Sequence, residues 1–288
     1  MAWRPWWMRH DLHGPAECSQ SFFHWPLVGR DALCVNTGFF KAANRQVTTG
    51  KAVSRSKQSL GVSEASGLAA LDDGTFLVVD DEQGIFHCVP GGGPVHLGAG
   101  ESLSDLEGVS VTPDGRYACI LCESDGSVWR FSIRGHDLTE GRQLGRLPRL
   151  SKEKNKGWEG IFVVDAGVLA AEAVILAVHQ AKPRRIGMFD AETLQQRSLL
   201  RLPKTARKNI DDLNDVAVAP DGRILLLSGR CGRIAELDLE TGSLVLQAIY
   251  QIETATGDVP EGITVDAEGR IWICTDGKGL LHQVELVQ

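Results

Sequence analysis

The sequence lacks long apolar runs and an excess of positive charge. No stretch of its 288 residues approaches the roughly 18 uncharged apolar residues of a membrane helix, and its N-terminus has no apolar signal core. We therefore expect no membrane span and a cytoplasmic location. The formal net charge is −7, which argues against a general nucleic-acid partner, because such proteins present a basic face to phosphate.

Standard catalytic signatures are missing as well. There is no G-x-S-x-G elbow, no H-E-x-x-H pair and no G-x-x-x-x-G-K-[ST] phosphate loop. The seven cysteines are odd in number and scattered, which favours buried thiols over a disulfide framework. Cys119 and Cys122 lie three apart in a strand-like run, so they should point to opposite faces and not hold one metal ion.

What the sequence has in abundance is a repeated unit. It occurs five times, each time followed by a glycine seven residues after the central position: Ser66-Gly67-Leu68, Glu107-Gly108-Val109, Glu159-Gly160-Ile161, Asn214-Asp215-Val216 and Glu261-Gly262-Ile263. That gap fits a strand of about five residues and a tight turn. The interval between central positions runs from 41 residues (67 to 108) to 55 (160 to 215), which is the spacing of propeller blades.

These intervals predict an all-β fold, a β-propeller over residues 47–288. Five blades are the direct count, and six would require residues 18–60 to contain a degenerate blade. The last unit is too short for a fourth strand, so an N-terminal strand over about 47–60 should close the ring. Residues 1–46 form a Trp-rich extension, with Trp3, Trp6, Trp7, Trp25, His10, His13 and His24. Its histidines either ligate a metal or belong to an irregular segment, and we favour the second.

The residue before each central position is expected to lie in a ring at one mouth of the central channel: Ser66, Glu107, Glu159, Asn214 and Glu261. Carboxylates about 8 Å apart repel by roughly 2 kcal/mol per pair at an effective dielectric near 20. A proton, a basic partner or a bound cation must offset this. Oxygen ligands suit calcium better than zinc, so we predict a calcium site formed by Glu107, Glu159, Asn214 and Glu261. The alternative is a hydrated ring, or one paired with Arg184, Arg185 or Arg230.

Second strands should end at the same mouth. There they carry Asp80, Asp81, Glu123 and Asp276, with His179 and Gln180 in the third unit. Of these, Asp81, Glu123 and Asp276 are candidates for a second ring of ligands. His179 is a candidate general base for a metal-activated water, although a histidine at a strand end is more often structural.

Basic residues precede the third and fourth units. Lys154, Lys156, Arg184 and Arg207 are candidates to bind an anion such as a phosphate ester or a carboxylate beside the cation. The alternative for each is a solvated loop charge.

The five units, and above all Asn155-Lys-Gly-Trp-Glu-Gly160 in the third, resemble the repeats of the SdiA-regulated (YjiK/CarP-like) family over about residues 60–288. That family is related to phytase-like and esterase-like propellers. The resemblance implies a propeller linked to calcium, with acidic ligands at Glu107, Glu159, Glu261, Glu123 and Asp276. The sequence departs from the family pattern at Asn214-Asp215, at Gln180 and in the absence of an export signal.

Two hypotheses about function follow. The first is a calcium-binding propeller that recognises a small anionic ligand or a protein partner through the channel mouth. The second is a metal-dependent hydrolase of a phosphate ester, an ester or a lactone. The sequence does not decide whether the protein is an enzyme.

Overall fold

The computed structural model describes residues 47–288 apart from 101, 152–155, 181 and 254–257. The chain divides into two units, Met1–Ala43 and Asn44–Gln288. The first unit, which contains most of the predicted Trp-rich extension, lies outside the described residues. In the second, twenty strands and one helical turn, α1 (Ala206–Asn209), are present among the described residues. The all-β class is confirmed, and no helix in this part is long and apolar enough to cross a membrane.

Three sheets are four-stranded antiparallel meanders in chain order. The first contains β2 (Ala65–Ala70), β3 (Phe76–Asp80), β4 (Gly84–Cys88) and β5 (Pro94–Leu97). The second contains β6 (Leu106–Val111), β7 (Tyr117–Cys122), β8 (Ser127–Arg134) and β9 (Asp137–Arg146). The third contains β10 (Trp158–Val164), β11 (Val174–His179), β12 (Arg185–Asp190) and β13 (Gln196–Arg201). Each meander starts at a predicted repeat unit.

The fourth sheet has eight strands, in the order β14-β15-β16-β17-β1-β20-β19-β18. Their bounds are β14 (Asp215–Val218), β15 (Ile224–Ser228), β16 (Arg233–Glu240), β17 (Ser243–Ile252), β18 (Val259–Val265), β19 (Ile271–Asp276), β20 (Leu280–Val287) and β1 (Thr48–Ser59). The expected pairing of an N-terminal strand with the last unit is present, and β1 runs antiparallel to β20. The parallel pairing of β1 with β17 was not predicted.

The length of β1 explains this second pairing. Its residues from Lys51 to Ser59 pair with β20, and its first five residues, Thr48 to Ala52, pair with β17. A strand of 12 residues therefore extends past the end of β20. In this way the terminal strand covers the edges of two neighbouring units, which would otherwise present unpaired backbone groups.

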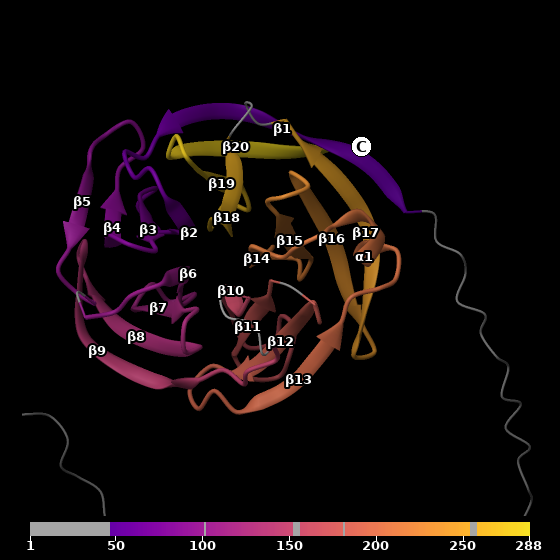
Figure 1. Ribbon diagram of the computed structural model, residues 1–288, viewed down its shortest axis with the longest axis horizontal. Helices are drawn as coiled ribbons and strands as arrows, with labels where there is room; N and C mark the ends of the chain where they lie inside the picture. The colour runs from indigo at the N-terminus through magenta and orange to yellow at the C-terminus, as the bar shows by residue number, and fades with distance from the viewer. Residues whose placement is uncertain (1–46, 101, 152–155, 181, 254–257) are drawn as a thin grey trace, which may run out of the picture. The chain divides into compact units, whose positions relative to one another are not determined.

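The first strands of the five units form a closed cycle of neighbours, in which β2, β6, β10, β14 and β18 each contact the next and β18 contacts β2 (Figure 1). This is the arrangement of a β-propeller. Adjacent first strands approach closely at the central glycines. A Cβ on Gly67 would lie 2.9 Å from the Glu107 carbonyl oxygen, and one on Gly108 would lie 2.9 Å from that of Glu159. Glycine is needed there because any side chain would push the strands apart.

The core lies between neighbouring sheets. The residue after each central position is fully buried, as the two-residue alternation predicts: Leu68, Val109, Ile161, Val216 and Ile263. Cys119 and Cys122 belong to different hydrophobic clusters, so they lie on opposite faces of β7 as expected. The five described cysteines are free, and four of them are buried.

Candidate functional site

The ring residues occupy the starts of the five first strands. Glu159 and Asn214 are buried, with 6% and 7% of their surface exposed. Ser66, Glu107 and Glu261 are half-buried. Acidic side chains are thus held partly out of water at one end of the first strands, an environment that disfavours their charged form.

The raised pKa values of these carboxyl groups show that their negative charges repel one another. Burial is the main cause that raises the pKa of Glu107 to about 8, and the carboxylate of Glu123 adds to it. Burial also raises the pKa of Glu159 well above its usual value, followed by the charges of Glu107 and Glu123. Glu261 contributes to both shifts. The expected convergence of Glu107, Glu159 and Glu261 is therefore present, and their mutual repulsion favours uptake of a proton or a cation.

Asn214 and Glu261 form a pair across neighbouring units. The Asn214 Nδ2 group donates to Glu261 Oε2, and its Oδ1 accepts from the Gly229 backbone N–H at 2.6 Å. Burial raises the pKa of Glu261 to about 7, and the hydrogen bond from Asn214 opposes that rise. The structure thus gives Asn214 the role of a donor to the ring, because its oxygen is directed to a backbone group.

Three carboxylates meet the size requirement of a calcium site. Asp105, Glu107 and Glu123 each offer an oxygen, and these atoms lie within 4.8 Å of one another. Calcium–oxygen bonds are 2.3–2.6 Å long, so ligands on opposite sides of the ion are about 4.8 Å apart. Asp105 was not among the predicted ligands. One signal pointed to it: an Asp two residues before the ring position recurs as Asp212 in the fourth unit. We call Asp105, Glu107, Glu123 and Glu159 the acidic cluster.

The other predicted second-ring acids lie in the first and last units. Asp81, Asp80 and Glu64 bring carboxylate oxygens within 4.8 Å of one another. Asp80 is fully buried and accepts from two backbone N–H groups of its own turn, so its role is structural. Asp276 forms an isolated bridge with Glu64, and its charge helps to raise the pKa of Glu261. Asp81 in turn helps to raise the pKa of Glu107.

A cavity of about 490 Å³ adjoins the acidic cluster and is lined by Glu123, Arg149, Lys156, Trp158 and His179 among others. We call it the Glu123 cavity. Glu123 Oε1 accepts from the Gly157 backbone N–H at 2.6 Å, which fixes the carboxylate between the cluster and the cavity. His179 is buried and meets the Trp158 ring edge-on, with 5.5 Å between ring centroids. The structure therefore brings the predicted Glu123, Lys156 and His179 to one cavity.

The remaining anion candidates are placed differently. The Arg184 guanidinium donates to the backbone carbonyl of Ile210, and to that of Arg207 at 3.2 Å, so it holds the segment around α1 in place. The Arg207 side chain is exposed on α1. Lys154 lies outside the described residues. Of the three candidates that the structure describes, Lys156 lines the Glu123 cavity.

Asp215 explains the departure of the fourth unit from the glycine pattern. Its side chain is buried and bridges two first strands: Oδ1 accepts from the Val216 N–H and Oδ2 from the Ile263 N–H, each at 2.8 Å. Burial raises its pKa well above the usual value, and the two backbone hydrogen bonds oppose this rise. A carboxylate thus fills the space between β14 and β18 and satisfies a backbone donor across it.

Asp215→Ala is expected to lower the free energy of unfolding by about 1–3 kcal/mol, because the buried Ile263 N–H would lose its acceptor. Urea unfolding monitored by circular dichroism measures the change. Asp211→Ala is the matched control, since Asp211 is an exposed acid in the preceding loop, and it should change stability by less than about 0.5 kcal/mol. Equal effects of the two substitutions would contradict the bridging role.

Comparisons with known proteins agree with this fold. The model of the family described as SdiA-regulated matches residues 76–277. Glutaminyl cyclase of Myxococcus xanthus is similar in structure, with a TM-score of 0.61 and 16% identity over 84% of this chain and 100% of that chain. The PQQ-bound aldose sugar dehydrogenase of Streptomyces coelicolor gives a TM-score of 0.53 and 14% identity over 83% and 98%. No curated protein matches the chain. At these identities, the structural likeness is evidence for the fold alone.

Proposed function

This chain belongs to the SdiA-regulated family, and we propose that it is a five-bladed, calcium-binding propeller that recognises a small anionic ligand at its channel mouth. One observation carries the proposal: carboxylates held partly out of water in different units lie close enough to help raise the pKa of Glu107 and that of Glu159. The blade count rests on the closed cycle of five first strands. A protein is the other partner we predicted, and one that presents an acidic group would use the same features.

Asp105, Glu107 and Glu123 would hold the ion, with Glu159 beside them. Their oxygen-only donor set and their spacing suit calcium. Bound calcium would neutralise the cluster and attract the oxygens of an anion. The Glu123 cavity extends from the cluster to Lys156, which would bind the anion as a point charge.

Calorimetric titration with calcium tests the metal site. We expect stoichiometric binding to the natural chain, weaker binding of magnesium, which needs a smaller and more rigid site, and no calcium binding to Glu107→Ala/Glu159→Ala. Glu172→Ala is the control, because Glu172 is exposed and pairs with Arg197 in the third sheet. Absence of calcium from the natural chain would mean that protons neutralise the cluster. Binding that survives the double substitution would place the ion elsewhere.

The anion site has its own prediction. In calcium-loaded protein, Lys156→Ala is expected to weaken binding of inorganic phosphate about tenfold, because it removes a charge-assisted hydrogen bond. The control is Lys204→Ala, which removes an exposed charge from another loop. Isothermal titration measures both constants. An unchanged phosphate affinity in Lys156→Ala would rule out the Glu123 cavity as the anion site.

A second candidate function is a metal-dependent hydrolase, favoured by the position of His179 in the same cavity as Glu123 and Lys156. A histidine near a bound cation is able to accept a proton from attacking water. Panels of phosphate esters, carboxylic esters and lactones should then be turned over by the natural chain and not by His179→Gln. Calcium binding without turnover would leave the protein as a binding module.

A further inference from the structure

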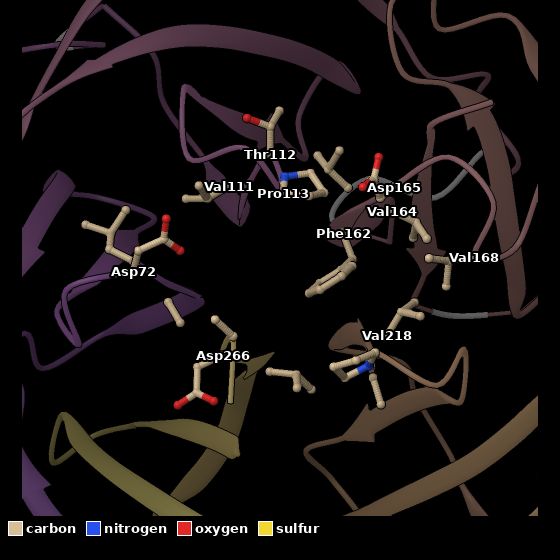
Figure 2. Close-up of a pocket in the computed structure, with 17 residues that line it drawn as sticks. Asp72, Val111, Thr112, Pro113, Phe162, Val164, Asp165, Val168, Val218 and Asp266 are labelled. Carbon is tan, nitrogen blue, oxygen red and sulfur yellow. The ribbon is translucent and has the colours of Figure 1, made fainter. Parts of the chain in front are cut away.

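A second cavity, of about 230 Å³, lies where the first strands end (Figure 2), whereas the ring residues lie where these strands begin. The ring residues precede the central position of each unit, whereas this cavity is lined by residues that follow it by two to eight positions. All five first strands or the turns after them contribute, through residues such as Leu71, Val111, Phe162, Val218 and Val265. We call it the strand-end cavity.

The wall of the strand-end cavity is mainly apolar. Valine, alanine, leucine and proline side chains from the five units form it, and the Phe162 ring points toward its centre in Figure 2. The other units carry smaller residues at the position of Phe162: Ala69, Ser110, Ala217 and Thr264. One phenyl ring thus forms an apolar floor on which the hydrocarbon part of a ligand can displace water.

The rim of the cavity is acidic. Asp72, Asp165 and Asp266 stand around the opening (Figure 2). Asp266 Oδ2 already accepts from Arg270 Nε at 2.6 Å and from an indole N–H. Within the described residues, no cationic side chain pairs with Asp72 or Asp165, and the Asp165 carboxylate accepts from the backbone N–H of Ala166 at 2.8 Å. Among the residues that the structure describes, no Lys or Arg lines the cavity.

We propose that the strand-end cavity binds a small organic cation, an ammonium with an aromatic or alkyl body. The body packs on Phe162 and the valines, while the ammonium stays at the rim beside Asp72 and Asp165, because burying a charge in the apolar floor would be costly. The volume restricts the ligand to a fragment, since cavities for larger ligands span about 300–1,000 Å³. The proposal is independent of the calcium site, which uses other residues at the other end of the strands.

Titration with 2-phenylethylammonium tests this proposal, with 2-phenylethanol and 3-phenylpropanoate as neutral and anionic analogues of the same body. We expect the ammonium to bind roughly fivefold more tightly than the alcohol at low salt, because one to two exposed ion pairs contribute about that much to affinity. The carboxylate should bind most weakly. Ligand-observed NMR measures the affinities. Equal affinities of the ammonium and the alcohol would overturn the proposal.

Three variants locate the binding. Asp72→Asn/Asp165→Asn should abolish the preference for the ammonium and leave the affinity for the alcohol unchanged. Val168→Lys adds a cation at an exposed rim position and should weaken the preference for the ammonium. Glu285→Gln on β20 removes a charge outside the cavity, where Glu285 pairs with Arg55, and should behave as the natural chain. An unaltered preference in the first two variants would refute the assignment.

Discussion

At pH 8 and without metal, Glu107→Gln/Glu159→Gln is expected to be more stable than the natural chain, and calcium is expected to reverse that order. Burial and neighbouring charge raise the pKa of Glu107 to about 8 and that of Glu159 well above its usual value. The folded protein must therefore either keep protons on these groups or bear their repulsion. Glutamine retains the shape of the side chain and carries no charge.

The sign of the pH effect follows from proton linkage. A carboxylate whose pKa rises from 4.5 in the unfolded chain to about 8 in the folded one binds more protons when folded. Its stabilising contribution is complete below pH 4.5 and is lost as the pH rises through about 8. The metal-free natural chain should therefore lose stability between pH 5 and pH 8, by on the order of a few kcal/mol. The double variant should lose much less.

Calcium acts in the opposite direction, because it binds the ionised carboxylates. At a free concentration of 100 times its dissociation constant, it should stabilise the natural chain by about 2.7 kcal/mol and the double variant not at all. Urea unfolding of both proteins at pH 5 and pH 8, with calcium or with EDTA, measures these free energies of unfolding. Glu172→Gln, an exposed acid, should follow the natural chain. A natural chain whose stability in EDTA is the same at both pH values would contradict the electrostatic account.

The positions of the strands were predictable because their signals are local. A glycine seven residues after each central position marks a turn, and two-residue alternation marks the buried face, so every meander begins where the sequence predicts. The parallel pairing of β1 with β17 was not predictable in this way. It depends on how far a 12-residue strand extends past its antiparallel partner in space, which no local pattern encodes.

The candidate site, too, was predictable only in part. Convergence of Glu107, Glu159 and Glu261 followed from the repeat, since equivalent positions in a ring of units face a common axis. The roles of Asn214 and Arg184 did not, because each side chain is directed by a nearby backbone group: the Gly229 N–H for Asn214, and carbonyls around α1 for Arg184. Sequence predicts which residues a symmetric fold gathers, but competing hydrogen bonds decide which atoms they present.

The close approach of the first strands leads to the largest expected loss of stability. Gly160→Ala should lower the free energy of unfolding by about 3 kcal/mol. A Cβ on Gly160 would lie 2.5 Å from the Asp215 Cα and 2.9 Å from the Asn214 carbonyl oxygen. Both contacts are with backbone of the neighbouring strand, so no side-chain rotation relieves them. The two strands must separate, and the hydrogen bond that Asp215 accepts from the Ile263 N–H on its other side weakens when Asp215 shifts.

The same separation should reach the acidic cluster, because Glu159 directly precedes Gly160. We expect Gly160→Ala to weaken calcium binding at a temperature where the variant is still folded, since the spacing between β10 and its neighbours sets the spacing of the carboxylates. Gly93→Ala is the matched control: a Cβ there meets no atom within 4 Å, and its stability should change by less than about 0.5 kcal/mol. Chemical unfolding and calcium titration of the two variants make the comparison. If Gly160→Ala were as stable as Gly93→Ala, the first strands would have room to move, and close packing of the units would not be what holds the carboxylates together.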